Sequence, residues 1–171
     1  MKITIKELRN GMTIYKDQQV MQVIEFENKN QFYHLKVMNF TTHNRQELDI
    51  PATETIETIT PKIINAELND IDGDTYLFFD TDAYDFLEVN KNAINNQKWI
   101  FETVACTLHA YNGIVYRVDP VRFIKAKVKK IEPGFRPIAV IENGTKIEVN
   151  SSVFVGDIIT IDTTTDQYLP Y

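Results

Sequence analysis

Residues with a branched β-carbon dominate this chain and restrict the secondary structure that it can form. Its 171 residues include 21 Ile, 13 Val and 17 Thr, whereas Ala and Leu, strong apolar helix formers, number 8 each. Branched side chains lose rotamer freedom in a helix and pack well on a pleated sheet. Two Asn-Gly pairs, Asn112-Gly113 and Asn143-Gly144, separate alternating apolar segments and favour hairpin turns. The sequence therefore predicts an all-β fold.

The expected strands fall into three sets, which predict three domains. The first set forms a meander that ends at Thr60-Pro61, because proline cannot donate to a β-ladder. The third set starts at the alternating segment that follows Phe123. We therefore expect domains at residues 1–62, 63–124 and 125–171. The strands are expected at 12–16, 19–26, 32–40, 46–50, 63–68, 75–79, 101–110, 114–118, from 123 onward, 137–141, 145–149, 157–161 and near Tyr168.

The segment from Asn90 to Trp99 is the best candidate for a helix. Asn90 can accept hydrogen bonds from the free backbone amides at a helix start, and Ala93 and Ile94 follow at near-helical spacing. We expect one short helix here, with Trp99 buried. One helix among many strands is compatible with a small barrel.

The charge of the chain restricts its partners. A net charge of −6 and a sequence pI near 5.1 exclude a simple basic nucleic-acid binder. Residues 63–123 contain 4 basic and 10 acidic side chains, whereas the two charge types balance in residues 1–62 and in residues 124–171. The phosphate backbone of a nucleic acid would therefore repel the middle of the chain but not its two ends.

The single cysteine and the charged amino terminus indicate the compartment. Cys106 lies in an apolar run and cannot form an internal disulfide, so we expect a small core side chain. The first eleven residues carry charges every few positions, without the apolar stretch of a signal peptide or membrane span. We expect a cytoplasmic protein that does not associate with membranes.

Few residues point to catalysis. The chain has 3 histidines, His34, His43 and His109, which lack metal-binding spacing and cysteine partners. No phosphate-binding glycine loop or nucleophile elbow occurs among the 6 glycines. The acidic alternation that starts at Asp70 has Thr81 at its twelfth position, where a calcium loop needs glutamate. The sequence predicts no enzyme, no metal site and no cofactor.

A row of basic residues accompanies the cleanest alternation in the chain. Ile124, Ala126 and Val128 share one face of the expected strand, so the residues between them share the other. This row can face phosphates, or it can protect an exposed strand edge from pairing with another chain. The two interpretations remain open. The basic residues are Arg122, Lys125, Lys127, Lys129 and Lys130.

Three stretches in this order carry a pattern found in one family. The first is LRNGMTIYKDQQVMQVIEFE at 8–27, and the second is NKNAINNQKWI at 90–100. The third runs from Glu132-Pro133-Gly134 through NGTKIEVNSSVFVGDIITIDTTTDQY at 143–168, with a Val-Gly-Asp segment and a late tyrosine. Together they span nearly the whole chain. In content and order they resemble the bacterial elongation factor P family.

The resemblance implies a fold, a function and partners. The implied fold is an L-shaped chain of three β-barrels, an SH3-like domain followed by two OB-fold domains. The implied function is a non-enzymatic elongation factor that imitates tRNA, binds the ribosome beside peptidyl-tRNA and promotes peptide-bond formation on stalling sequences such as polyproline. The partners would be rRNA, peptidyl-tRNA and a lysine-modifying enzyme, and the protein would act as a monomer. The alternative is a divergent OB-type RNA- or ribosome-binding module without stall-rescue activity.

The resemblance also assigns site residues, with departures. The family's first-domain tip is a Lys-Pro-Gly-Lys/Arg-Gly loop whose central basic residue is often modified, whereas this chain has the shorter Glu27–Gln31 segment. Lys29 is the one basic residue there, so the tip contact and modification site fall on Lys29, flanked by Asn28 and Asn30. The family's basic residue after the late tyrosine is absent here. The other expected RNA contacts are Arg136, Tyr168, Lys125, Lys127 and Lys129.

Overall fold

The computed structural model describes residues 1–170 and is built from β-strands, with three short 3-10 turns and no α-helix in this range. All neighbouring strands of the first and third of its three sheets pair antiparallel, and so do three consecutive strands of the second. The predicted all-β fold is therefore confirmed. Residues 109–117 pack with residues 1–63, and residues 64–108 form a second compact unit with the chain from Val118 onward. The predicted domain bounds at 62/63 and 124/125 stay a prediction.

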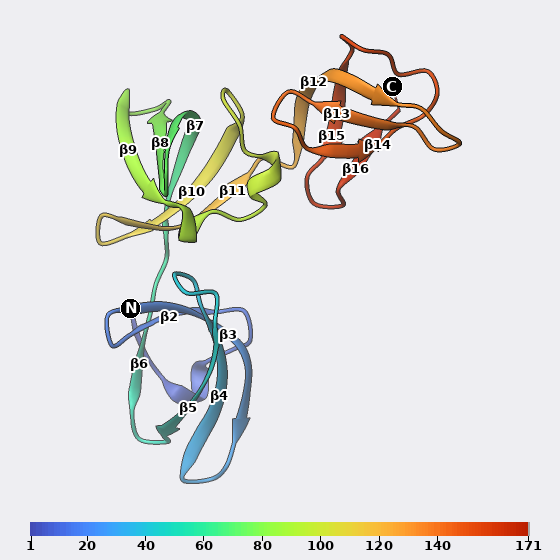
Figure 1. Ribbon diagram of the computed structural model, residues 1–171. Helices are drawn as coiled ribbons and strands as arrows, with labels where there is room; N and C mark the ends of the chain where they lie inside the picture. The colour runs from blue at the N-terminus through green and yellow to red at the C-terminus, as the bar shows by residue number, and fades with distance from the viewer. Residues whose placement is uncertain (171) are drawn as a thin grey trace. The chain divides into compact units, whose positions relative to one another are not determined.

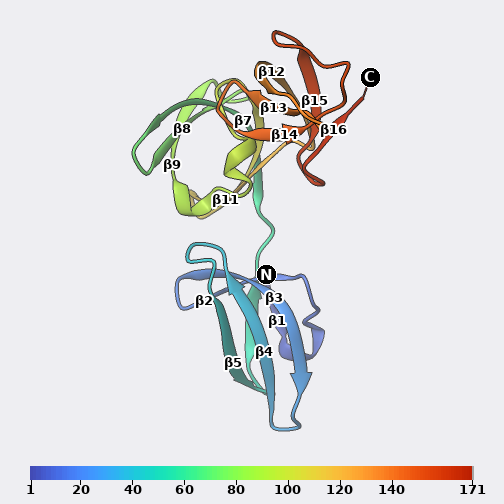
Figure 2. The same cartoon turned by 45° about the vertical axis from the view of Figure 1, so that its right-hand side comes forward.

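The first sheet has six strands in the order β1-β6-β2-β3-β4-β5. Its strands are β1 (Lys2–Thr4), β2 (Thr13–Lys16), β3 (Gln19–Asn28), β4 (Phe32–Asn39), β5 (Arg45–Pro51) and β6 (Thr55–Thr58). The 3-10 turn η1 (Ile5–Glu7) follows β1. Figure 1 and Figure 2 show the long β3–β4 hairpin extending beyond the rest of this sheet. The buried core contains Ile5, Leu8, Ile14, Met21, Val23, Tyr33, Leu35, Val37, Ile50 and Ile56.

The second sheet has five strands in the order β11-β10-β7-β8-β9. They are β7 (Lys62–Asp72), β8 (Thr75–Asp80), β9 (Asp85–Asn90), β10 (Ala105–Tyr111) and β11 (Ile114–Pro120). The end of the β10–β11 hairpin packs on the first sheet, where Tyr116 forms a buried cluster with Phe40 and Ile59. The Phe40 and Tyr116 ring centroids lie 5.2 Å apart. Cys106 is buried on β10, as predicted.

The third sheet has five strands in the order β14-β13-β12-β15-β16. They are β12 (Phe123–Glu132), β13 (Ile138–Ile141), β14 (Lys146–Glu148), β15 (Ile158–Asp162) and β16 (Gln167–Leu169). Residues 123–127 of β12 pair with β15, and Val128–Glu132 pairs with β13. The predicted alternation on β12 is confirmed, because Ile124, Ala126 and Val128 are buried while the lysines between them are exposed.

The predicted helix from Asn90 to Trp99 is wrong. The segment forms two separate 3-10 turns, η2 (Lys91–Ala93) and η3 (Gln97–Trp99). The side chain of Asn90 does accept a 2.9 Å hydrogen bond from the amide of Asn92, as predicted for a cap. The chain then becomes extended at Ile94, which forms a parallel bridge with Val118. A tertiary backbone contact therefore replaces helix propagation.

Both predicted Asn-Gly hairpins are present, with different turns. Asn112 and Gly113 form a two-residue connection, and both have positive φ (51° and 76°), as a type I′ turn requires. In the second hairpin Gly144 alone has positive φ (86°), and the connection between β13 and β14 is longer. There the Asn143 side chain donates to the carbonyl of Lys98 at 2.8 Å. This second asparagine thus joins two parts of the second unit.

Candidate functional site

The predicted tip residues lie at the end of the β3–β4 hairpin (Figure 1). The amide of Lys29 donates to the Phe32 carbonyl at 2.9 Å, which closes the loop. The amide of Asn30 donates to the Asn28 side chain at 2.8 Å, and Asn30 has φ 69°, a left-handed conformation that asparagine tolerates. The structure thus brings Asn28, Lys29 and Asn30 together in one hydrogen-bonded turn.

Lys29 is exposed but carries a carboxylate partner. Its Nζ lies 2.7 Å from Oε1 of Glu27, and the two side chains are 44% and 65% exposed. The hydrogen bond from Lys29 lowers the pKa of Glu27 below its ordinary value, so this carboxylate stays ionised near neutral pH. Exposed ion pairs contribute only about 0–1 kcal/mol to stability. Breaking the Lys29–Glu27 ion pair to bind a phosphate therefore costs little free energy.

A second polar group lies on the same hairpin. Nδ1 of His34 lies 2.6 Å from Oδ1 of Asp49, and Nε2 lies 3.8 Å from Oε1 of Glu47. The Asp49 hydrogen bond raises the pKa of His34 above its ordinary value, and both nearby carboxylates act in the same direction. No local pattern in the sequence predicts this pairing, because it depends on the β4–β5 register, in which His34 lies opposite Asp49.

The lysine row occupies one face of β12, an interior strand in the sheet order. Lys125 lies opposite Thr160 and Lys127 opposite Ile158 on β15. Lys129 is the extra residue of a β-bulge, because Val128 and Lys130 pair with the adjacent residues Ile141 and Val140. Each half of β12 pairs with one neighbour, residues 123–127 with β15 and Val128–Glu132 with β13, so protection of an exposed edge and anion binding both remain open for this row. The exposed lysines remain available to bind anions.

Tyr168 does not lie with the lysine row on one face. Tyr168 pairs with Ile161, which pairs with the buried Ile124, whereas the neighbouring row contains Lys125. Directly opposed residues point to the same face of a sheet, so Tyr168 and Lys125 point to opposite faces. Arg136 is exposed, and its Nη1 lies 3.8 Å from Oε1 of Glu148. The expected RNA contacts therefore divide between two surfaces.

An anchor that sequence analysis missed connects η3 to the end of the third sheet. The Trp99 side chain is buried, and its indole Nε1 donates to Oδ1 of Asp166 at 2.6 Å. Nζ of Lys98 lies 2.7 Å from Oδ2 of the same carboxylate. The Lys98 carbonyl accepts hydrogen bonds from Asn143 and Thr145 at 2.8 and 2.9 Å. Lys98 and Trp99 thus hold η3 against the third sheet within the second unit.

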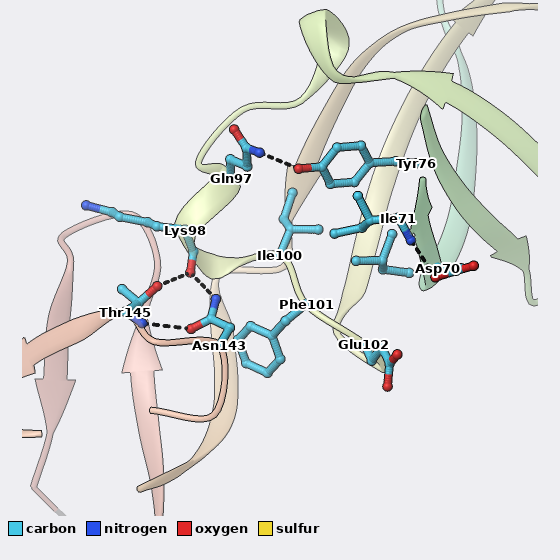
Figure 3. A pocket seen from close by; sticks show the side chains of 11 residues that line it. Asp70, Ile71, Tyr76, Gln97, Lys98, Ile100, Phe101, Glu102, Asn143 and Thr145 are labelled. Carbon is cyan, nitrogen blue, oxygen red and sulfur yellow. Dashed lines mark hydrogen bonds between the residues drawn. The ribbon is translucent and has the colours of Figure 1, made fainter. Parts of the chain in front are cut away.

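A hollow of about 610 Å³ lies beside this anchor (Figure 3). The Gln97 side chain donates to the hydroxyl of Tyr76 within it, and the ammonium group of Lys98 points away from the other lining side chains. Asp70 and Glu102 give it two carboxylates. None of its lining residues is a histidine, cysteine or serine.

Across residues 1–170, no group of three or more His, Cys, Asp or Glu side chains is arranged to hold a metal ion. In the same range, no helix is long and apolar enough to span a membrane.

The comparisons with known proteins agree with the fold. The elongation factor P of Caldicellulosiruptor bescii is 32% identical over 183 aligned positions, which cover 95% of this chain and 96% of the relative. The elongation factor P of a Thermoanaerobacter species is 31% identical over 98% of each chain. The solved eukaryotic translation initiation factor 5A from Methanococcus jannaschii has a TM-score of 0.55 at 13% identity, covering 72% of this chain and 94% of that one. No family model matches the chain.

The two curated relatives decide the family, because each exceeds 30% identity across nearly its whole length. The solved structure shows a shared fold alone. The sequence resemblance that rested on three separate stretches is therefore confirmed over the full chain. This chain belongs to the elongation factor P family of translation factors.

Proposed function

We propose that this protein binds the ribosome beside peptidyl-tRNA and promotes peptide-bond formation on stalling sequences such as polyproline. Family membership supports the general role. The observation that carries the specific proposal is the ordered β3–β4 tip, which presents one exposed cation, Lys29, at the end of a long hairpin. The ribosome would perform the chemistry. The protein would hold the tRNA end in a productive geometry, which lowers the entropic part of the barrier.

Lys29 would act by exchanging partners. In the free protein its ammonium group is paired with Glu27. A phosphate close to the tip would compete for the same ammonium, and the contact would be a charge-assisted hydrogen bond, stronger than a neutral one. A modifying enzyme that extends Lys29 would carry the contact further from the loop. Mass spectrometry of proteolytic peptides from the protein purified from its own host tests this step, with a mass increase on the Lys29 peptide expected.

The lysine row would supply a separate contact to rRNA. Lys125 and Lys127 lie on one face of β12, and Lys129 is exposed at the bulge that follows. The 63–123 segment carries a net negative charge and would be repelled by RNA. Binding energy would therefore come from the two ends of the chain. Arg136 would add a contact from the third sheet, and Tyr168 would make its contact from the face opposite Lys125.

The test is a purified translation reaction on a triple-proline template, with and without this protein. We expect the parent protein to relieve stalling and Lys29→Ala to lose most of that effect while it still binds ribosomes. Lys36→Ala is the matched control, because Lys36 is an exposed cation on the same hairpin, paired with Glu25 at 2.9 Å and distant from the turn. Equal activity of the parent and Lys29→Ala would contradict the role of the tip.

The alternative function is a ribosome- or RNA-binding module without stall rescue. One observation favours it: 183 positions align with the Caldicellulosiruptor relative, more than the 171 residues of this chain, so the relative contains stretches with no counterpart here. In the sequence comparison with the family, one such stretch is missing from this chain at the tip around Lys29. Ribosome binding by a parent protein that leaves the triple-proline stall unchanged would establish this alternative.

A further inference from the structure

An exposed aromatic cluster lies on the β8–β9 hairpin, away from the residues used above. Phe79, Tyr84 and Phe86 form it, with the Phe79 centroid 6.2 Å from Tyr84 and 5.3 Å from Phe86. Tyr84 is 80% exposed and Phe86 is 53% exposed. Aromatic rings cost free energy when they face water, so two exposed rings beside the half-buried Phe79 indicate an interaction site.

The hairpin holds these rings in place by specific contacts. Phe79 lies opposite Phe86 in the β8–β9 ladder. The buried Asp80 accepts hydrogen bonds from the amides of Asp82 and Ala83, each at 2.9 Å, which fixes the connecting turn. Tyr84 has φ 56°, a strained conformation for a large aromatic residue. The cluster is therefore preorganised, at the edge strand of its sheet.

Negative charge surrounds the cluster. Between Ile63 and Asn90 the chain has eight carboxylate side chains and neither lysine nor arginine. Glu67 lies opposite Phe79 on β7, and Glu88 is on the same strand as Phe86, two positions further on. Both glutamates are exposed, as are Asp82 and Asp85 in the turn. The rings thus lie inside an anionic border.

We infer that this aromatic-acidic surface binds a protein segment rich in arginine and lysine. A cation over the face of an aromatic ring is attracted by the ring quadrupole, and arginine does this most often. The surrounding carboxylates attract the same cations and repel a phosphate backbone. RNA stacking on the rings is therefore disfavoured. The inference does not depend on stall rescue, since it uses none of the tip or lysine-row residues.

The test measures binding to the full-length protein at low salt by fluorescence anisotropy. The probe is a fluorescein-labelled peptide of alternating arginine and serine, compared with a glutamate-serine peptide and with labelled oligouridine. We expect the arginine peptide alone to bind. The variant Tyr84→Asn/Phe86→Thr should bind it about tenfold more weakly. Asparagine tolerates the left-handed conformation at position 84, and threonine suits an exposed strand, so this variant should fold.

Matched variants separate the aromatic and the acidic contributions. Glu67→Gln/Glu88→Gln should also weaken binding and flatten its salt dependence, whereas Phe154→Ser removes an aromatic ring that is 66% exposed elsewhere and should leave binding unchanged. Thermal unfolding by circular dichroism confirms that each variant folds. Four outcomes would overturn the inference: no binding of the arginine peptide, equal binding by parent and aromatic variant, oligouridine binding lost in the aromatic variant, or self-association lost in that variant.

Discussion

The indole Nε1 of Trp99 and the carboxylate of Asp166 form a 2.6 Å hydrogen bond between residues 67 positions apart in the sequence. Trp99 is 1% exposed, so its N–H has little access to water. Lys98 binds the other carboxylate oxygen at 2.7 Å. Asp166 has φ 57°, which places it in the left-handed region at the turn between β15 and β16. One carboxylate therefore satisfies two donors from the η3 segment.

Replacement of this carboxylate should destabilise the protein. Asp166→Ala leaves the buried indole N–H without an acceptor, so we expect unfolding in urea to require about 1–3 kcal/mol less free energy. Asparagine in Asp166→Asn retains an oxygen acceptor and tolerates the left-handed backbone, so this variant should lose less stability than Asp166→Ala. Equal stability of the parent and Asp166→Ala would show that the indole finds another partner.

The same carboxylate predicts a pH dependence. Hydrogen bonds from Lys98 and Trp99 lower the pKa of Asp166 below its ordinary value. Its contribution to stability is therefore present above the ordinary pKa of aspartate, about 3.9, and is lost as the pH falls through the lower folded-state value. Urea unfolding measured from pH 6 to about pH 2 should show a smaller acid-induced loss in Asp166→Asn than in the parent.

His34 should titrate above its ordinary value. The hydrogen bond to Asp49, with additional attraction from Glu47, raises the pKa of His34. The folded state thus favours the protonated ring, and this stabilisation is present below the ordinary pKa and is lost as the pH rises through the folded-state pKa. An NMR titration should show a lower His34 pKa in Asp49→Asn, with Asp17→Asn as an exposed aspartate control. An unchanged His34 pKa would refute the pairing.

The lysine row should determine part of the salt dependence of ribosome binding. The triple variant Lys125→Gln/Lys127→Gln/Lys129→Gln removes three positive charges that would contact phosphates. It should reduce the slope of log affinity against log salt by about 2–3. Lys146→Gln is the control from the same sheet, because its ammonium is paired with Glu132 at 2.8 Å. Sedimentation of ribosomes at several salt concentrations measures the slope. An unchanged slope in the triple variant would show that RNA contacts a different surface of the protein.

Cys106 should be inert in the folded protein. Its side chain is buried on β10, and burial raises the pKa of the thiol to about 12. The thiolate is the reactive form, so iodoacetamide at neutral pH should leave the native protein unlabelled and label it in urea. Mass spectrometry after each treatment gives the result. Rapid labelling without urea would indicate frequent local opening of the second sheet.

Local sequence signals predicted much of the fold. Alternation of apolar and polar residues predicted the strand that begins at Phe123, and the two Asn-Gly pairs predicted the hairpins at Asn112-Gly113 and Asn143-Gly144. Both signals act over only a few residues. The strands β1, β6 and β9 were missed. The β1–β6 pair connects Lys2 with Glu57, and no local pattern reports a partner 55 positions away. The Asn90 cap was predicted correctly, but the helix was not.

Tertiary structure decided the rest, for reasons that lie outside any short segment. Ile94 is extended because it pairs with Val118, and the buried indole N–H of Trp99 has an acceptor because the third sheet brings Asp166 to it. Composition and order determined the all-β class and the family. Sheet register determined which predicted residues can act together, since it places Lys125 and Tyr168 on opposite faces. A one-residue change of register would exchange those faces, and sequence alone does not state the register.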